Sequence, residues 1–424
     1  MHKRLKTKLE TKVKRKTQVR KIVELKIDKS HLSKSTKSLL YTLFKEAKYF
    51  FNYCLSLDDL STVDTKIKSV PVVTPNGIEE RELSVLSSQM KQAIHNRIFS
   101  NIKTLHTLKE KGFKVGWIGF TSNFSSIPLK QAHVTYEIEN NYLRLQGIKK
   151  KIKLSGTNQI PDNYELANAH LIKRNNDFFL HVTCYMEKDE EYKEEQKLLY
   201  ESIKDKTVCI DLGCETQVTL DNGIKIKYEV PVNKRIRKIS RRINRNKKNN
   251  TKNKNSRNMF KKRLLLQKEY NKLNNKKRDI KNKIVSVLRK NYKYVCYQED
   301  SIASWQKNGH GKKINKTGLG GLISILKDRI LTPVPVSQFF PSTKTCSKCG
   351  KKKKVELDER IYICDNCKLE IDRDINAAIN IKREGMSKIP DGLRELTLQE
   401  TVTSASQVFN SLKGIEDLTV SYCR

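Results

Sequence analysis

The N-terminal quarter of the chain reads as one strand followed by two helices. Between residues 20 and 27, apolar side chains alternate with polar ones, which is typical of a strand. Residues 37–55 carry apolar side chains at helical spacing instead. These are Leu40, Leu43, Phe44, Ala47, Phe50, Phe51 and Cys54. A second helix is predicted over about 87–111, where apolar and basic residues form separate faces.

The next stretch, residues 112–187, changes to the pattern of strands. Short runs such as V-G-W-I-G-F, A-H-V-T-Y-E-I, Y-L-R-L and D-F-F-L-H-V-T-C-Y are separated by Asn, Gly and Pro turns. Together with the strand at 20–27, they predict a small β-barrel that the helical pair interrupts. A basic barrel is a common platform for nucleic acid, but a fold by itself leaves the ligand open.

The C-terminal half places acids where two apolar strands end. The run V-C-I-D-L predicts a buried strand that ends at Asp211, and V-C-Y-Q predicts another that ends at Glu299 and Asp300. An unpaired acid at the end of a buried strand costs several kcal/mol, so it usually binds a cation or a proton. In isolation, Asp211 could equally be a turn-forming residue.

Basic and polar segments surround these strands. Residues 233–293 predict two long Lys/Arg/Asn-rich helices, which either are solvated or contact phosphates along a duplex. A Gly/Lys/Asn loop is expected over 305–317, then a helix over 319–330 and a strand over 334–340. The polar tail from residue 388 onward is expected to be partly disordered.

The composition of the chain limits the kinds of partner that it can bind. The 86 basic residues outnumber 46 acidic ones, which gives a net charge of +40 and predicts a polyanionic partner such as nucleic acid. A hydrophobic content of 37% argues against disorder, and 424 residues suit roughly two to four domains. The lysine-rich residues 1–20 predict a flexible arm that orders on nucleic acid, or a solvated tail.

The same composition bears on location. No apolar run approaches the roughly 20 residues that span a bilayer, and no signal-peptide core follows the basic N-terminus. We therefore expect a cytoplasmic protein without a membrane partner. Six cysteines outside the motif described next are then expected to be reduced packing residues. They are Cys54, Cys184, Cys209, Cys214, Cys296 and Cys423.

The remaining four cysteines form two C-x-x-C pairs separated by 14 residues: Cys346 with Cys349, and Cys364 with Cys367. Two such pairs are the signature of a zinc ribbon, because each turns a knuckle that offers two thiolates to one tetrahedral ion. Free or disulfide-bonded cysteines are the alternative. A four-cysteine zinc site is closed and does no chemistry, so any catalysis must come from carboxylates. Glu370, Asp372 and Asp374 follow within a few residues, and Asp374 is expected near a helix N-terminus, which favours an anion.

These residues resemble a known family. The string P-S-T-K-T-C-S-K-C-G, followed by C-D-N-C and D-R-D-I-N-A-A-I-N-I, closely resembles the C-terminal signature of the TnpB (OrfB) family. That family comprises transposon-encoded RNA-guided DNA endonucleases with a RuvC-like nuclease core, and it is related to compact type V CRISPR effectors. D-L-G at Asp211 and the acids at 299–300 match its other two catalytic motifs in order. The chain departs where Gln298 and Ser301 replace an apolar residue and a leucine.

The resemblance implies a multidomain α+β protein. Its RuvC-like (RNase H-like) α/β nuclease core would carry an inserted zinc ribbon, and an N-terminal wedge β-barrel would be interrupted by a helical recognition domain. On this sequence the implied domains are a basic arm at 1–19, a wedge barrel at 20–35 and 112–190, a recognition domain at 36–111, a nuclease domain at 200–345 and 368–387, a zinc ribbon at 346–367, and a C-terminal tail at 388–424.

The site residues follow from the same motifs. Asp211, Glu299 and Asp374 are the expected catalytic ligands of Mg²⁺ or Mn²⁺, with Asp372 as a supporting acid and Asp300 as the alternative to Glu299. Three acids beside sheet elements suit a two-metal hydrolase, whose ions lie roughly 3.5–4 Å apart and stabilise the attacking and leaving oxygens. The four cysteines of the ribbon are expected to hold a structural zinc ion.

The implied function is RNA-guided cleavage of double-stranded DNA by a protein that a transposable element encodes. A noncoding guide RNA derived from the element's end would select the target, together with a short flanking motif. Two alternatives stay open at this point. One is a nuclease-inactive, RNA-guided DNA-binding repressor, and the other is an accessory, transposase-like DNA-binding protein that needs no guide.

Overall fold

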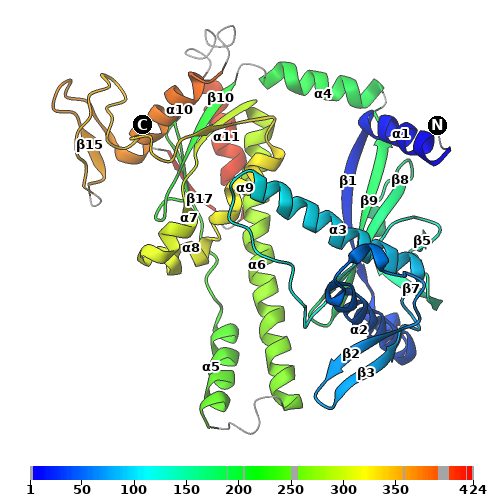
Figure 1. Cartoon of the computed structure of the whole chain (residues 1–424). Helices are drawn as coiled ribbons and strands as arrows, with labels where there is room; N and C mark the ends of the chain where they lie inside the picture. Colours follow the sequence, from blue (N-terminus) through cyan, green and yellow to red (C-terminus); the bar gives the residue numbers. More distant parts are fainter. Residues whose placement is uncertain are drawn as a thin grey trace. The chain divides into compact units, whose positions relative to one another are not determined.

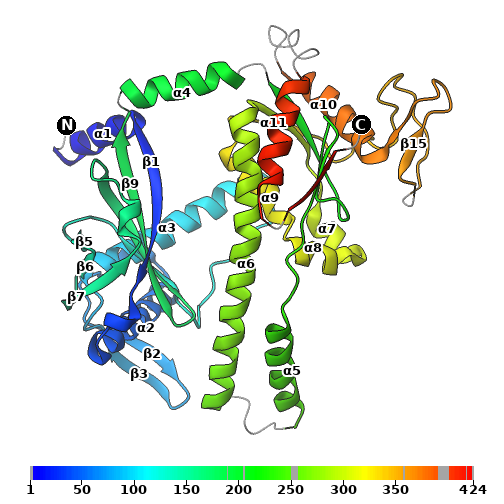
Figure 2. The ribbon, with the colours of Figure 1, turned by 180° about the vertical axis from the view of Figure 1, so that it is seen from behind.

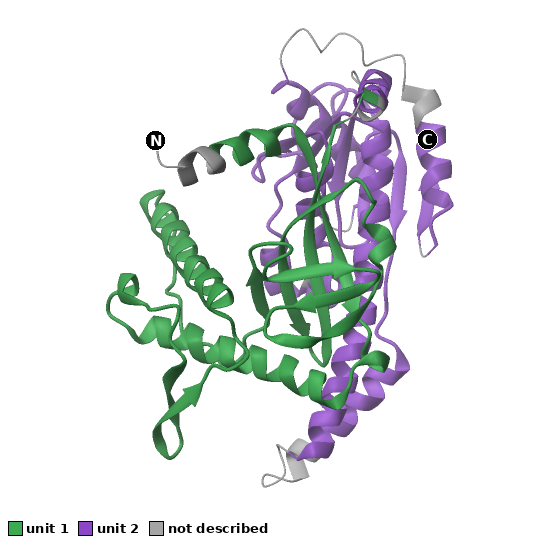
Figure 3. Ribbon diagram, turned by 90° about the vertical axis from the view of Figure 1, so that its right-hand side faces the viewer, with its two compact units in different colours: residues 1–190 green, residues 191–424 purple. Residues whose placement is uncertain are grey.

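The chain forms two compact units, Met1–Glu190 and Glu191–Arg424, coloured separately in Figure 3. The computed structural model describes residues 3–188, 190–203, 206–249, 256–356, 359–389, 401–416 and 418–422. Cys423, one of the cysteines expected to be reduced, lies outside these ranges. No helix within them is both long and apolar enough to span a bilayer.

The first unit is built on a seven-stranded antiparallel sheet in the order β4-β8-β9-β1-β7-β6-β5. Its strands are β1 (Gln18–Ile27), β4 (Ser126–Leu129), β5 (Tyr136–Glu139), β6 (Tyr142–Leu145), β7 (Ile148–Ser155), β8 (Glu165–Arg174) and β9 (Asp177–Glu187). Its other elements are α1 (Lys3–Lys16), α2 (Lys34–Ser56), the hairpin β2 (Ser69–Thr74) and β3 (Gly77–Glu82), and α3 (Ser88–Glu110).

The alternating pattern explains why β1 is central. Val23, Leu25 and Ile27 are buried, and β1 pairs with β9 along most of its length. The apolar face predicted for residues 37–55 is also buried, and α2 packs into the same hydrophobic core as β1. These predicted elements are confirmed. The sheet is close to the expected barrel, but no hydrogen-bonded pairing among the described residues joins its end strands β4 and β5.

Two expectations for the first unit are wrong. The lysine-rich arm contains helix α1, because lysine and arginine are good helix formers and the helix end is anchored. Arg15 donates to Glu165 (2.6 Å), and its guanidinium lies 3.9 Å from the ring centroid of Tyr185. The run V-G-W-I-G-F forms no strand, and Trp117 within it is 99% exposed.

The second unit contains a six-stranded sheet in the order β14-β13-β10-β11-β12-β17. Its strands are β10 (Thr207–Leu212), β11 (Val218–Leu220), β12 (Ile224–Lys227), β13 (Tyr294–Gln298), β14 (Thr332–Val336) and β17 (Thr419–Tyr422). Its longer helices are α4 (Glu190–Ile203), α5 (Lys234–Asn249), α6 (Arg257–Asn291), α9 (Gly320–Arg329), α10 (Arg373–Met386) and α11 (Thr401–Lys413). A small hairpin, β15 (Ile361–Ile363) and β16 (Glu370–Asp372), precedes α10.

Helices cover both faces of this sheet. Strands β10, β13 and β14 are parallel, while β11, β12 and β17 continue the sheet in antiparallel fashion. On one face α10 packs closely, since Ala377 and Ala378 are fully buried and a Cβ at Gly385 would collide with the sulfur of Cys296. On the other face α6, α9 and α11 share a core with the sheet, and α6 and α11 lie side by side (Figures 1 and 2).

Two expectations for the second unit are also corrected. Residues 305–317 are not a loop, because α7 (Ile302–Trp305), a π-helical turn (Gln306–His310) and α8 (Gly311–Thr317) follow one another there. The C-terminal tail also contains regular structure. Val408 and Leu412 are buried at helical spacing in α11, and β17 adds an edge strand to the sheet by pairing with β12.

Candidate metal centres

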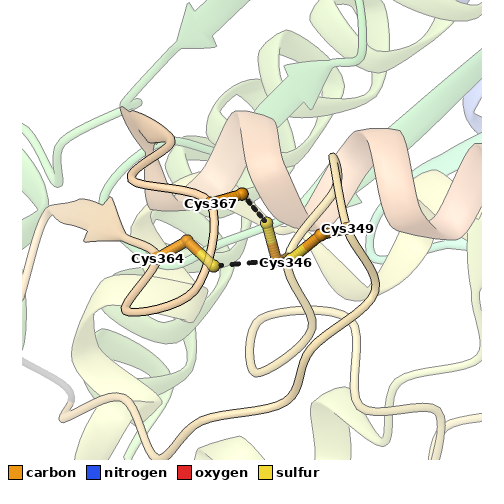
Figure 4. Close-up of side chains that lie close together, drawn as sticks. All are labelled: Cys346, Cys349, Cys364 and Cys367. Atoms are coloured by element: carbon orange, nitrogen blue, oxygen red, sulfur yellow. Dashed lines mark hydrogen bonds between the residues drawn. The ribbon is translucent and has the colours of Figure 1, made fainter.

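The four ribbon cysteines meet in one cluster (Figure 4). Their sulfur atoms all lie within 4.8 Å of one another, with 3.6 Å between Cys346 and Cys367 and between Cys349 and Cys364. These separations exceed the roughly 2.05 Å of a disulfide and are close to the ~3.8 Å expected between thiolates around tetrahedral zinc. The backbone N–H of Lys351 lowers the pKa of Cys349 to about 6, which favours the thiolate that a metal needs. The donor set therefore fits zinc.

The local backbone explains why the cysteines converge. Each pair forms a tight turn that a hydrogen bond closes, from the Gly350 N–H to the Cys346 carbonyl (2.9 Å) and from the Lys368 N–H to the Cys364 carbonyl (3.0 Å). Gly350 and Lys368 occupy equivalent positions and both have positive φ, +76° and +58°. Two similar knuckles thus present their thiols to one point, as the spacing predicts.

Helix α10 holds the first knuckle in place through two buried asparagines. The Asn376 side chain donates to the Thr345 carbonyl (2.8 Å) and accepts from the Ser347 N–H (2.9 Å). Asn380 donates to the Thr345 and Ser342 carbonyls (2.6 and 2.9 Å). Because buried backbone groups need partners, these amides fix the ribbon to the helix. This explains the two asparagines in D-I-N-A-A-I-N, whose partners the sequence pattern does not reveal.

A second cluster, of carboxylates, lies at the carboxyl ends of the parallel strands. Asp211 is the penultimate residue of strand β10, Asp300 follows β13, and Asp374 is in the first turn of α10. All three line one cavity of about 480 Å³. Since β10 and β13 are parallel neighbours, their carboxyl ends meet at the same sheet edge. The fold therefore brings together acids that are far apart in sequence.

The electrostatics of this acid cavity favour a bound cation. Burial, and then the carboxylates of Asp374 and Asp300, raise the pKa of Asp211 well above its usual range. Burial also raises the pKa of Asp300 to about 6. Arg373 lines the same cavity and opposes the shift at Asp211. Acids crowded in this way are stabilised by a divalent ion, and all-oxygen donors suit Mg²⁺ or Mn²⁺.

Asp372 positions Asp374 and lies beside the cavity residues. Its Oδ1 accepts hydrogen bonds from the N–H groups of Asp374 (3.0 Å) and Ile375 (3.2 Å), which caps α10. Its Oδ2 accepts from Lys225 on β12 (2.5 Å), so the helix start is tied to the sheet. Asp372 is not among the residues that line the cavity, and its contacts suit the supporting role expected for it.

Glu299 lies apart from the other predicted catalytic acids. Its carboxylate accepts from Lys327 (2.7 Å), both side chains are about half exposed, and Glu299 does not line the cavity. Strand register gives the reason. Ile210 pairs with Tyr297, so the next residues, Asp211 and Gln298, share one face of the sheet and Glu299 faces away. The structure thus brings Asp300, rather than Glu299, to Asp211 and Asp374.

Gln298 is a cavity residue that the sequence does not single out for this role. Its side-chain amide donates to the carbonyls of Ser337, Gln338 and Phe340, at 2.9–3.2 Å. Its oxygen accepts from the Ser342 hydroxyl (2.9 Å). The only sequence signal was a polar residue at the end of an apolar strand. Gln298 fixes the segment that forms one wall of the cavity.

The long basic helices provide a third feature. Six basic side chains of α5 line a separate hollow of about 470 Å³. They are Lys234, Arg237, Lys238, Arg241, Arg242 and Arg245. No acid is among the residues that line this hollow, so phosphate groups would match its charge. This agrees with the phosphate-contact interpretation of residues 233–293.

Known proteins match this chain in the region of these two clusters and beyond. Residues 327–381 match the family model described as the Cas12f1-like TNB domain. A protein of Streptomyces pristinaespiralis named as an RNA-guided DNA endonuclease is 30% identical over 198 residues, which cover 44% of this chain and 48% of that protein. A TnpB-like protein of Acanthamoeba polyphaga mimivirus is 45% identical over 53 residues, or 12% and 10% of the two chains.

A solved structure also aligns broadly. The cryo-EM structure of a Cas12f1–sgRNA–target DNA complex covers 82% of this chain and 83% of its own, with 14% identity and a TM-score of 0.42. A TM-score this low does not establish a common fold for the whole chain. The matched region spans about half the length of the Streptomyces relative. Taken with the motifs and the cysteine cluster, the sequence matches confirm that this chain resembles the TnpB family.

Proposed function

We propose that this chain is an RNA-guided DNA endonuclease encoded by a transposable element, and that it hydrolyses phosphodiester bonds in the acid cavity. The observation that carries the proposal is the convergence of Asp211, Asp300 and Asp374 at one sheet edge. The relative named as an RNA-guided DNA endonuclease and the TnpB-like relatives support the choice of reaction. The net charge of +40 suits nucleic-acid partners.

The strand order supports a RuvC-like core. Three antiparallel strands, β12-β11-β10, are continued by two parallel ones, β13 and β14, which is the arrangement of RNase H-like nucleases. In open α/β sheets ligands bind at the carboxyl ends of the strands, and Asp211 lies at that end of β10. The tail strand β17 is an addition at the far edge of the sheet.

In this proposal Asp211 and Asp374 hold divalent metal, together with one acid of the doublet that follows β13. The resemblance assigns that place to Glu299, and the geometry favours Asp300 because it faces the other two acids. Bound Mg²⁺ or Mn²⁺ would activate the attacking water and stabilise charge on the leaving oxygen. Asp372 orients Asp374 by capping α10. Arg373, beside the acids, supplies a positive charge to the phosphate.

The remaining parts have supporting roles. The four cysteines would hold a structural zinc ion, which keeps the ribbon attached to α10. The basic face of α5 would contact the backbone of an RNA–DNA duplex, where a protein reads shape rather than sequence. The first unit would supply the wedge sheet and, from α2 and α3, the recognition helices that grip guide RNA and target DNA.

Copurified RNA provides the test. The full chain is purified at high salt, the bound RNA is sequenced, and double-stranded DNA matching that RNA is offered with Mg²⁺. We expect a discrete RNA species and cutting of matched DNA only, with RNA-free protein as the control. A discrete RNA with target binding but no cutting would indicate a repressor. Strand transfer without RNA would indicate a transposase-like protein instead.

A further inference from the structure

The lining of the acid cavity includes side chains that the proposed chemistry does not use. Besides the carboxylates, three aromatic side chains line it: Trp305, Phe339 and Phe340. Trp305 and Phe340 are partly buried against the two cores that flank the sheet. Phe339 is different, because 84% of it is exposed. A cavity that combines acids with an accessible aromatic ring offers two kinds of contact within the reach of one nucleotide.

The turn that carries Phe339 and Phe340 is held firmly. Phe339 and Phe340 lie in a turn in which the Phe340 N–H donates to the Ser337 carbonyl (3.1 Å), and the Phe339 N–H donates to the Ser337 hydroxyl (3.3 Å). The buried amide of Gln298 donates to three carbonyls of this segment and accepts from Ser342, so all its hydrogen-bonding groups face the turn. An exposed ring on a fixed turn loses little freedom when a ligand stacks on it.

We propose that Phe339, which lines the cavity together with Phe340 and Trp305, is a base-stacking subsite for an unpaired nucleotide next to the scissile phosphate. Base–aromatic stacking tolerates any sequence, since every base has a π-face, and this suits an enzyme whose guide selects the target. The charges argue for the same occupant. Lys344 and Arg373 line the cavity with the rings, so a phosphate can lie between the basic side chains and the acids that would bind metal.

The geometry also bears on the form of the substrate. A base inside a duplex is covered on both faces by its neighbours and cannot stack on a protein ring until it leaves the helix. The Phe339 subsite therefore selects a strand that is already unwound or a nucleotide turned out of the stack. This inference rests on the proposed function for the position of the phosphate, but the binding of an unpaired base can be measured without any cutting.

Photocrosslinking tests the subsite. The full chain with its copurified RNA is mixed with single-stranded DNA carrying 5-iododeoxyuridine, in Ca²⁺, which carboxylates also bind, in place of Mg²⁺. After irradiation, the crosslinked peptides are identified by mass spectrometry. We expect the main crosslink in the peptide that contains Phe339 and Phe340, and at least tenfold less from the same oligonucleotide in a duplex. Equal crosslinking of single strand and duplex would overturn the inference.

Matched variants make the test specific. F339A should reduce that crosslink by about tenfold, because it removes the stacking surface, and F339W should restore it. F260A, at a phenylalanine of α6 that is 58% exposed and outside the cavity, should leave it unchanged. A crosslink that survives F339A, or one that maps only to another exposed aromatic such as Trp117, would contradict the subsite.

Cutting assays on the same preparations separate the two proposals. Protein that cuts matched DNA but gives no crosslink at Phe339 would refute the subsite and leave the nuclease function intact. Protein that crosslinks at Phe339 but cuts no DNA under any condition would refute the nuclease function and leave the subsite as part of a binding protein. When both hold, F339A should also slow cutting, and F339W should recover it.

Discussion

The two candidate metal centres of the second unit differ in how their ligands are assembled. The cysteine cluster comes from 22 consecutive residues, 346–367, and its sulfurs converge because each knuckle closes on its own backbone hydrogen bonds. The acid cavity takes its carboxylates from three segments that only the tertiary fold brings together. The first centre is therefore specified locally, whereas the second depends on strand register and on the position of α10.

Helix α10 connects the two centres. Its first turn carries Asp374, and Asp372 caps it, while Asn376 and Asn380 farther along bind the first cysteine knuckle. A disturbance at the ribbon should therefore reach the acid cavity through this helix. The reverse is not expected, because removing a carboxylate leaves the knuckles and their hydrogen bonds in place. The experiments below test this asymmetry.

The largest effect is expected from losing the ribbon. C364S removes one thiolate of the four, so zinc content should fall from about one per chain towards zero, and the protein should lose several kcal/mol of stability, because metal binding supplies folding free energy. Zinc analysis and thermal unfolding are the measurements. C214S, at a partly buried cysteine outside the cluster, is the control. Full zinc independence of folding would show that the cysteines are structural thiols only.

The next test compares the two adjacent acids that follow β13, Glu299 and Asp300. D300N and E299Q are compared for cutting of matched DNA with Mg²⁺, and both should keep zinc. The geometry predicts that D300N slows cutting by roughly 10²–10³-fold, as for other groups that stabilise transition-state charge, whereas E299Q retains more activity. The opposite ranking would mean that Glu299 leaves Lys327 and turns towards Asp211, as the resemblance implies. K327A should then leave cutting intact or raise it.

Removing the hydrogen bonds between α10 and the first cysteine knuckle should have a smaller effect, but it should disturb both the cysteine cluster and the acid cavity. N376A leaves the Ser347 N–H and the Thr345 carbonyl without their buried partner, which costs about 1–3 kcal/mol of stability. Cutting should fall with it, since Asp374 lies in the same helix. N274A, at an exposed asparagine of α6, is the control. A variant that loses stability but cuts DNA as well as the parent would show that α10 does not couple the centres.

The last prediction of this series concerns the pH dependence of stability. The pKa of Asp300 is raised from 3.8 to about 6 in the folded protein, so between these values the folded state holds a proton that the unfolded state has lost. Stability without Mg²⁺ should therefore fall as pH rises from about 4 to 6, by on the order of 2–3 kcal/mol. D300N should flatten this dependence, and Mg²⁺ should counteract the loss. A D300N melting curve with the parent's pH dependence would contradict the assignment.

The sequence predicts the local parts of this molecule well. Alternating and helical patterns correctly indicate β1, α2, β10 and β13, and the cysteine spacing correctly predicts a cluster of four thiols. Asp211 and Asp374 were expected together, and the structure places them in one cavity. Each of these features depends on residues that are neighbours in the chain or on an acid at a strand end.

Features that depend on long-range packing cannot be predicted from the local sequence pattern. The register of β10 against β13 decides whether Glu299 or Asp300 faces Asp211, and no local motif encodes that register. The strand β17 is too short and polar to be recognised before its partner β12 is known. Gln298 appears only as a departure from an apolar position, and its four hydrogen bonds emerge when the turn at 337–342 folds against it.

The most direct test of the account separates binding from cutting. D211A and D374A proteins, with the copurified guide RNA and Mg²⁺, are compared with the parent for binding of matched double-stranded DNA and for its cleavage. Both acids are proposed to hold metal at the scissile phosphate and to contact no base, so binding should stay within about twofold while cutting falls by orders of magnitude. If both variants cut DNA as fast as the parent, the acid cavity is not a nuclease site.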